Sequence, residues 1–287
     1  MQAYVRFAIL VIGACGVSPR GEQTPRDSGA GSNLGSNTGS GSGSGTPCAG
    51  CYSVYAHSDT TLYVVDVQTK ALNTVGRFNA PAGETMTDLA VAPDNTIYVI
   101  SEKALYTADA TDGHVSELGS LSACGTKGVA LTTTPDGKLW TGDYMGTICQ
   151  IDLTQTPPAV RAPVSMSSGL ALTGDLAAVA DGTVFGTAYK KTDTSGHGSQ
   201  LDNLLVKIDL ATGAVTPVGS TGYPKLFGVA FAANKVFGFT HDGTGDVVTI
   251  DPMTGAGTLF GTFIDPATST GISFGGAGVN SMVPIIE

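Results

Sequence analysis

Few side chains of this chain are suited to catalysis or to metal binding. His57, His197 and His241 belong to the residue type that most often binds zinc, and Glu84 and Asp88 form a pair of carboxylates like those that cleave glycosides. The sequence contains no nucleophile elbow and no glycine-rich phosphate loop that follows a strand and opens a helix. We therefore predict no catalytic residue, no cofactor and no bound metal, with the histidines solvated and the two carboxylates serving as ordinary loop acids.

Two short phrases recur along the chain from Cys51 onward. The first is an apolar run that ends in aspartate, and its five copies end at Asp66, Asp109, Asp152, Asp209 and Asp251. The second begins with glycine or aspartate followed by small and apolar residues, and its five copies begin at Asp88, Gly128, Gly169, Gly228 and Gly271. Both series lengthen at the same interval, so a single insertion over residues 190–203 explains both.

The recurring aspartates are interpreted as turn caps. An aspartate carboxylate at the end of a strand accepts hydrogen bonds from backbone N–H groups two or three residues further on. A calcium site would need further oxygen ligands in the same loop, and the loops lack them. We therefore predict a structural role for this position in each repeat.

Each repeat divides into four short strands separated by turn residues. In the clearest copy the strands are expected over residues 87–91, 97–101, 105–108 and 115–118. A four-stranded antiparallel unit that recurs about every 40 to 45 residues is typical of a propeller blade. The first strands are rich in glycine and alanine, so we expect them to line the crowded central channel.

The two ends of the repeat region complement each other. Residues 52–56 match the second strand of a repeat and residues 271–274 match the first strand, so the ends are expected to join in one blade. Such closure removes exposed sheet edges. The sequence therefore predicts an all-β fold, a five-bladed β-propeller of four-stranded antiparallel blades whose ring closes between the N- and C-terminal strands. An open array of hairpins or a sandwich is the structural alternative.

One phrase of the repeat resembles a known group of propellers. The pattern Ile-Asp-x-x-Thr-Gly at residues 208–213 and 250–255 is similar to the blades of NHL and quinoprotein-like propellers. The resemblance covers residues 52–287 and rests on generic blade motifs. It implies the fold and no particular activity, because propellers carry many functions.

The blade pattern places the polar residues on one face of the ring. Loops that join the fourth strand to the next first strand share a face with loops that join the second strand to the third. Three of the four histidines and the insertion fall on this face, and loops on a rigid scaffold usually carry binding. The predicted ligand-binding residues of this face are His57, Glu84, Asp88, Lys127, Asp143, Tyr144, His197, Lys225, His241 and Asp242.

Four cysteines besides Cys15 predict two disulfides in an exported chain. Cys124 precedes a first strand and Cys149 lies in the third strand of the same blade, both toward one face, whereas Cys51 enters from the opposite face. The pairing Cys48–Cys51 with Cys124–Cys149 is therefore favoured over the other two. The alternatives for Cys48 and Cys51 are a redox pair, which usually sits at a helix start, or half of a zinc site.

Residues 1–14 have the parts of an export signal, with a positive flank, an apolar run and small residues before Cys15. Residues 12–15 resemble a bacterial lipobox, which implies that Cys15 is lipidated and, with Gly16 next to it, that the protein is directed to the outer membrane, facing the periplasm or the cell surface. Cleavage near Ala14 without lipidation is the alternative. Residues 15–47 then comprise the lipidated cysteine and a linker with nine glycines and seven serines, which is too poor in apolar residues to fold. The propeller is assigned to residues 48–287.

The composition limits the partners. The formal net charge of -10 argues against nucleic acid, which needs clustered lysine and arginine. The predicted partners are a lipid membrane, through the N-terminal anchor, and a protein or glycan ligand. The sequence thus predicts a cell-envelope lipoprotein whose propeller is a non-catalytic binding scaffold. The alternatives are a propeller enzyme, a hydrolase or lyase at the channel mouth with or without a metal, and a purely structural envelope component.

Overall fold

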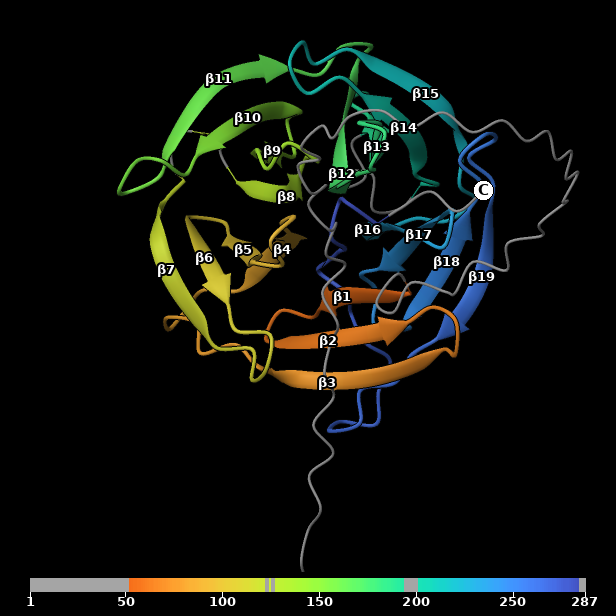
Figure 1. Ribbon diagram of the computed structural model, residues 1–287. Coiled ribbons are helices and arrows are strands. Elements are labelled where there is room, and N and C mark those ends of the chain that lie inside the picture. Colours follow the sequence, from red (N-terminus) through yellow and green to blue (C-terminus); the bar gives the residue numbers. More distant parts are fainter. Residues whose placement is uncertain (1–51, 122–123, 125–126, 194–200, 284–287) are drawn as a thin grey trace, which may run out of the picture. The chain divides into compact units, whose positions relative to one another are not determined.

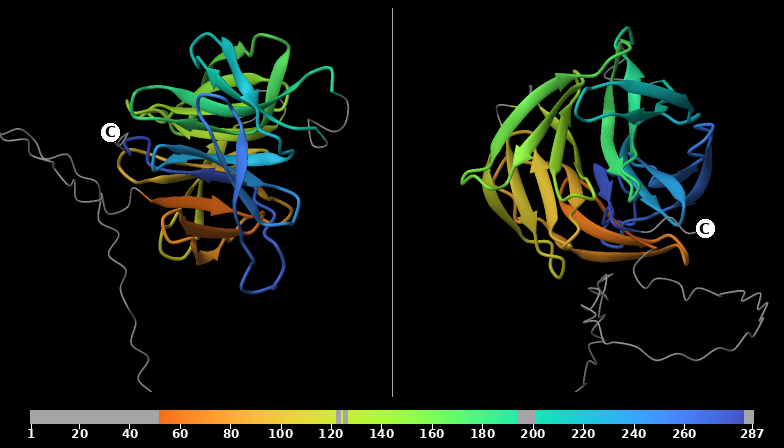
Figure 2. Two further views of the ribbon diagram at one scale, coloured as in Figure 1. Left: turned by 90° about the vertical axis from the view of Figure 1, so that its right-hand side faces the viewer. Right: turned by 45° about the horizontal axis from the view of Figure 1, so that its top comes forward.

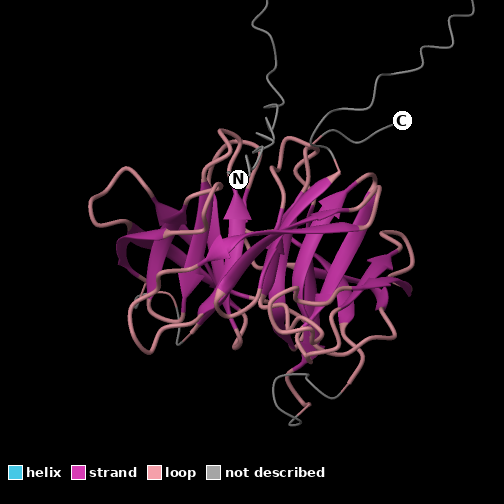
Figure 3. Cartoon of the chain, turned by 90° about the horizontal axis from the view of Figure 1, so that it is seen from below, coloured by secondary structure: helices cyan, strands magenta, loops and turns pink. Residues whose placement is uncertain are grey.

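The computed structural model describes residues 52–121, 124, 127–193 and 201–283, and these residues form twenty strands and no helix (Figure 3). None of the described residues therefore forms a helix that is long and apolar enough to cross a bilayer. The fold is an all-β, five-bladed β-propeller, as predicted. The strands alternate with short turns, and residues that tolerate a positive φ, such as Asn95, Gly137 and Asn234, lie in several of the hairpin turns.

The strands form five antiparallel four-stranded sheets arranged in a ring (Figure 1). Blade 1 contains, from the axis outward, β20 (Gly276–Gly278), β1 (Ser53–His57), β2 (Thr61–Asp66) and β3 (Ala71–Arg77). Blade 2 contains β4 (Met86–Val91), β5 (Ile97–Ser101), β6 (Ala104–Ala108) and β7 (Val115–Ser120). Blade 3 contains β8 (Gly128–Thr133), β9 (Leu139–Asp143), β10 (Thr147–Asp152) and β11 (Ala159–Ser165). Blade 4 contains β12 (Leu170–Ala178), β13 (Val184–Lys190), β14 (Leu204–Ile208) and β15 (Val215–Ser220), and blade 5 contains β16 (Leu226–Ala232), β17 (Lys235–Thr240), β18 (Asp246–Ile250) and β19 (Gly257–Thr262).

The ring closes within blade 1. The C-terminal strand β20 pairs antiparallel with β1, in the register Gly276 with His57 and Gly278 with Tyr55. Closure between the two ends of the propeller is therefore confirmed. The strand that closes the ring is nevertheless not the predicted segment 271–274, which precedes β20 and anchors it through the buried side chain of Phe274.

The first strand of blade 4 also differs from the prediction. The phrase at Gly169 was predicted to open the first strand at the axis, but a bulge in β12 between Leu172 and Leu176 interrupts its pairing with β13. The segment that lies at the axis in register with the other blades begins at Asp175. The predicted insertion, by contrast, is found where expected, because β13 ends at Lys190 and β14 begins at Leu204.

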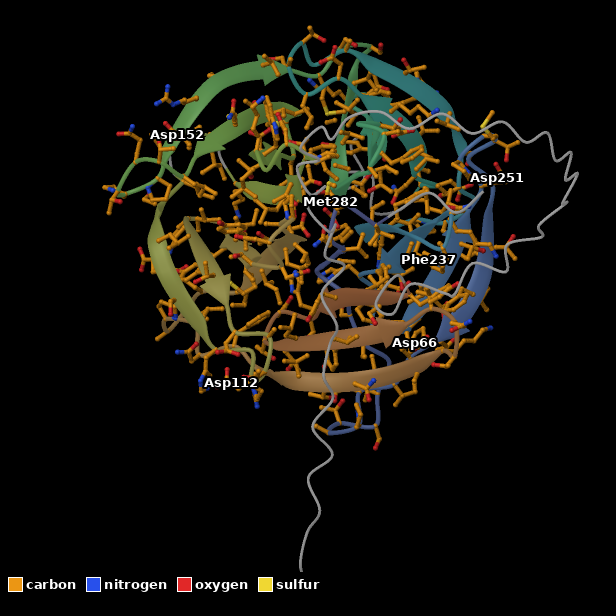
Figure 4. All side chains as sticks on the ribbon, in the orientation of Figure 1. Asp66, Asp112, Asp152, Phe237, Asp251 and Met282 are labelled. Carbon is orange, nitrogen blue, oxygen red and sulfur yellow. A yellow bond between two sulfur atoms is a disulfide. The ribbon has the colours of Figure 1, made fainter. Side chains whose placement is uncertain are left out.

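The recurring aspartates have the same setting in all five blades. Each ends a third strand or directly follows it, and its Oδ1 accepts the N–H of the residue two positions later; for Asp66 the acceptor distance to Gln68 is 2.8 Å, and for Asp251 the distance to Met253 is 2.7 Å. Asp66, Asp152 and Asp251 lie toward the rim of three separate blades (Figure 4). The turn-cap interpretation is confirmed.

The core lies between neighbouring blades. Five clusters of buried apolar side chains fill the spaces between adjacent sheets, and burying this surface is the main term that holds blades face to face. A disulfide joins Cys124 to Cys149 in blade 3, with the two Cα atoms 6.0 Å apart. The other predicted pair, Cys48–Cys51, lies outside the described residues.

The ring has two faces. The insertion face carries the loops between second and third strands and between blades, including the connection from β13 to β14. The terminal face carries the other turns and both ends of the described propeller, since the Tyr52 carbonyl accepts the Val67 N–H and the Asn280 amide donates to the Pro93 carbonyl. In the side view, the blue segment that leads to the C-terminal end lies on one face, and the described residues that flank the β13–β14 connection lie on the other (Figure 2).

Candidate functional site

Two carboxylates lie at the axis of the ring. The five inner strands place Asp88, Ala130, Asp175, Gly228 and Gly276 at equivalent positions, directly after a bulge in blades 2 to 5. Asp88 and Asp175 are completely buried, and the three other positions hold very small residues. Small residues are needed there because a Cβ on Gly276 would collide with the Asp88 carboxylate.

Asp88 joins blade 2 to blade 3. Its Oδ1 accepts the N–H of Leu89 at 2.7 Å, and its Oδ2 accepts the N–H of Leu131 at 2.6 Å. The prediction that Asp88 is an ordinary loop acid is wrong. Its side chain points from a strand into the channel, where backbone N–H groups solvate it in place of water.

Asp175 joins the other three blades. Its Oδ1 accepts the N–H of Leu176 at 2.5 Å, and its Oδ2 accepts the N–H groups of Val229 at 2.8 Å and of Ala277 at 3.2 Å. The two carboxyl groups together therefore contact all five inner strands. Ala277 belongs to the three-residue strand that closes the ring.

The Asp88 and Asp175 carboxyl groups also hydrogen-bond to each other, which requires that one of them carries a proton. Burial raises the pKa of both carboxyl groups well above the ordinary value, and the neighbouring Asp175 charge raises the pKa of Asp88 further. Asp175 accepts three backbone N–H groups and Asp88 accepts two, so the negative charge is better stabilised on Asp175. We assign the proton to Asp88.

His57 lies beside this pair, with its side chain completely buried. Its Nδ1 donates to the Ser58 carbonyl at 2.8 Å, so the neutral ring carries its proton there and Nε2 has a free lone pair. Nε2 has no hydrogen-bond partner among the described residues and lies 2.7 Å from where a Gly276 Cβ would stand. Burial, with a smaller contribution from His241, lowers the pKa of His57 to about 4.

His241 completes the group at the mouth of the channel on the insertion face. Its Nδ1 donates to the Phe274 carbonyl at 3.0 Å, and its ring stacks on Phe227 with centroids 4.7 Å apart. The Gly275 N–H in turn donates to the His57 carbonyl at 2.7 Å. The structure thus brings together His57, Asp88 and His241 from the predicted set, and we call these three residues with Asp175 the axial cluster.

The remaining predicted carboxylates are engaged in local hydrogen bonds. Glu84 accepts hydrogen bonds from Ser101 Oγ at 2.6 Å and from Tyr106 Oη at 2.7 Å, and these bonds lower the pKa of Glu84. Asp143 is almost fully buried and caps its own turn. Asp242 does the same through Thr244. These carboxylates shape loops and are not grouped for a reaction.

The remaining predicted residues are spread over the insertion face. Lys127 forms an exposed ion pair with Glu102 at 2.8 Å. The Tyr144 carbonyl accepts the hydroxyl proton of Tyr189 at 3.0 Å, and the Lys225 carbonyl accepts the His241 N–H. His197 lies outside the described residues, so the suggested three-histidine metal site is not tested. Within the described ranges no three His, Cys, Asp or Glu side chains are arranged to hold a metal ion.

A cavity of about 620 Å³ opens beside the β13–β14 connection on the insertion face. Tyr189, Lys190 and Leu204 line its strand side, and Leu201 and Asp202 line its loop side. Leu201 is 56% exposed, so its apolar side chain is available to a molecule that enters the cavity. A volume of this size is typical of a ligand site.

No family model and no curated protein matches this chain. Among solved structures, a chain of a nidogen/laminin complex is 12% identical, with 80% of this chain and 98% of that chain covered and a TM-score of 0.49. A protein of unknown function from Bacteroides caccae is 13% identical, with 72% and 70% covered and a TM-score of 0.45. A PQQ-bound aldose sugar dehydrogenase from Streptomyces coelicolor is 14% identical, with 59% and 60% covered and a TM-score of 0.43. At these levels the assignment of the fold depends on the sheet pairings of the chain itself.

The axial cluster contains one residue that the sequence analysis missed. Asp175 was not among the predicted site residues, although Asp175-Leu-Ala-Ala repeats the pattern Asp88-Leu-Ala-Val. That similarity was hidden because the better copy of the phrase begins six residues earlier, at Gly169, directly before the same strand.

Proposed function

We propose that this chain is an exported, membrane-anchored lipoprotein whose propeller binds a protein or a glycan at the cell envelope without catalysis. The observation that carries the proposal is the cavity at Leu201 on the insertion face. The ionisable groups at the axis support the same conclusion, because both carboxylates already accept backbone N–H groups and His57 is sealed inside the ring. Such groups stabilise the scaffold and are poorly placed to touch a substrate.

The disulfide between Cys124 and Cys149 is consistent with an oxidising compartment outside the cytoplasm.

The binding surface is tested with the full chain on an array of glycans and an array of extracellular proteins. We expect binding that Leu201→Asp weakens and that Met253→Asp leaves unchanged, because Met253 is an exposed residue on a turn of the terminal face. Binding that is insensitive to Leu201→Asp, or no binding on either array, contradicts the proposal. The anchor is tested by Cys15→Ser, which should move the protein from the membrane fraction to the soluble fraction.

The second candidate is a propeller enzyme, a hydrolase or lyase that acts at the channel mouth. The observation that favours it is the grouping of His57, Asp88 and Asp175 at the axis, because ionisable groups with shifted pKa values gather at functional sites, although the burial of these three argues against contact with a substrate. Elemental analysis separates the candidates for the metal-dependent case. Stoichiometric zinc or calcium that is lost in His241→Ala would support the enzyme, and absence of any stoichiometric metal would count against this form of it.

A further inference from the structure

An aromatic residue occupies the same position in all five blades. Tyr55, Tyr98, Trp140, Phe185 and Phe237 are equivalent residues of the five second strands, and each lies at the interface with the next blade. In two blades another ring covers the aromatic side chain. Phe185 stacks on Phe231 with centroids 6.2 Å apart, and Phe237 meets Phe260 edge-on at 5.2 Å.

Trp140 has no such cover. It makes no ring contact with any other described residue, and it lines a cleft of about 510 Å³ between blades 3 and 4 on the terminal face, which we call the Trp140 cleft. The side chain of Trp140 is 9% exposed, and its Nε1 has no hydrogen-bond acceptor among the described residues. The indole N–H is therefore a buried donor that this part of the fold does not use, which is costly unless a bound molecule or a water satisfies it.

The walls of the Trp140 cleft are apolar near the indole and charged at the rim. Val184 and Leu210 are buried beside Trp140, and Asp136, Lys138, Lys207 and Asp209 surround the opening. Asp136 and Lys138 form an ion pair at 2.6 Å, and the two remaining charges are also of opposite sign. The charges of the two acids and the two lysines cancel, so the cleft favours a ligand without net charge. A ligand that offers many hydroxyl groups can still hydrogen-bond to these four side chains.

A second cleft lies on the other side of the turn between β8 and β9. Tyr98, Pro93 and Pro135 line this space of about 340 Å³ between blades 2 and 3, and Asp136 in the turn lines both spaces. Tyr98 and Trp140 thus line neighbouring clefts on the terminal face. A ligand that fills both clefts must be a chain of several units.

We propose that the two clefts bind a neutral oligosaccharide. Sugar rings present C–H surfaces that pack against Tyr98 and against the exposed part of Trp140. Their hydroxyl groups hydrogen-bond with the charged side chains at the rim, which is the mixture of apolar contact and a few polar anchors that binding pockets use. This site lies on the face opposite to the Leu201 cavity and is independent of the function proposed above.

Trp140 is the only tryptophan of the chain, so tryptophan emission reports directly from the cleft. The full chain is titrated with cellohexaose, maltohexaose, mannohexaose and chitohexaose, with an acidic oligogalacturonate and a mixture of hexapeptides as competing probes. We expect at least one neutral glycan to change the emission saturably with a Kd below about 1 mM. Its monosaccharide should bind at least roughly tenfold more weakly, because it fills one cleft only.

Matched variants locate the site. Asp209→Asn and Asp251→Asn remove the negative charge of the same turn cap in blades 4 and 5 while keeping its acceptor oxygen, but only Asp209 lines the Trp140 cleft. Tyr98→Ala and Tyr55→Ala truncate equivalent aromatic residues, but only Tyr98 lines the second cleft. We expect the first member of each pair to weaken the glycan roughly tenfold and the second to leave it unchanged.

Three results would overturn the proposal: no neutral glycan changes the emission, a hexapeptide or the acidic glycan binds more tightly, or the two members of each pair behave alike. Glycan binding that is lost in Leu201→Asp and retained in Asp209→Asn would place the sugar on the insertion face. That outcome would refute the present inference and support the function proposed above.

Discussion

The assignment of one proton to the axial pair predicts that two similar substitutions differ in cost. Asp88→Asn replaces a neutral acid with a neutral amide, which keeps an acceptor oxygen and N–H donors that can face Asp175. Asp175→Asn replaces the ionised partner, whose two oxygens accept three backbone N–H groups. An amide has only one acceptor oxygen. The NH2 group of Asn at position 175 therefore faces a backbone N–H, and the proton on Asp88 no longer has a carboxylate to which it can donate.

The magnitudes follow from the hydrogen bonds that are lost. Asp88→Asn leaves one buried backbone N–H without an acceptor, a loss of about 1 to 2 kcal/mol in the free energy of unfolding. Asp175→Asn breaks a buried charged network, a loss of about 3 to 5 kcal/mol. For a domain of this size each kcal/mol lowers Tm by roughly 2 to 4 °C, so Tm should fall by roughly 2 to 8 °C and 6 to 20 °C respectively.

Thermal unfolding followed by circular dichroism at pH 7 gives both Tm values, and urea titration gives the free energies. The exposed cap variant Asp66→Asn serves as a control for the chemical change alone. The folded pKa of Asp88 is raised above the unfolded value of about 3.9, so the folded state retains a proton and wild-type stability should fall as pH rises through that window. Asp88→Asn should flatten this dependence. Equal losses in the two variants, or a larger loss in Asp88→Asn, would refute the assignment of the charge to Asp175.

Other predictions concern the same ring. The folded pKa of His57 is lowered to about 4, so the unfolded chain takes up the proton first and stability should fall by about 1.5 kcal/mol between pH 6.5 and pH 5; His57→Asn should remove this loss in urea titrations at both pH values. Gly276→Ala should cost at least about 2 kcal/mol because its Cβ meets the Asp88 carboxylate, whereas the control Gly261→Ala, with its nearest atom 3.7 Å away, should leave Tm within about 2 °C of wild type. Replacing Cys124 and Cys149 by serine should cost about 3 kcal/mol, since the disulfide closes a segment with a sequence separation of 25; an unchanged Tm would show that this bond does not stabilise the fold.

Most of the fold could be predicted because repeats report the same structure five times. In blade 2 the predicted strands at 87–91 and 97–101 correspond to Met86–Val91 and Ile97–Ser101. The aspartate turn caps were predictable for a related reason, since a cap acts on residues two or three positions away and its signal is local. Errors arose where tertiary structure selects between two similar segments, as at Gly169 and Gly271. A bulge of variable length separates the recognisable phrase from the residues that reach the axis.

The site was less predictable because it depends on the direction of side chains across the ring. Sequence placed His57, Asp88 and His241 near the channel mouth but treated them as exposed, since a loop position says nothing about the residues that other blades bring against it. His57 is buried because Gly275 and Gly276 of the closing segment pack on its ring. Glycine at these positions was visible in the sequence, but its neighbour from the opposite end of the chain was not.

The axial acids explain how so short a strand closes the ring. The strand β20 has three residues, and it pairs with β1 through three positions only. One of its N–H groups is bound by Asp175, which also binds blades 4 and 5, and its glycine at 276 makes room for the Asp88 carboxylate that joins blades 2 and 3. The contacts of the two acids at the axis therefore add to the short pairing between β20 and β1. Because the five inner strands share these two carboxylates, loosening the closing strand and perturbing the acid pair should destabilise the propeller in the same way.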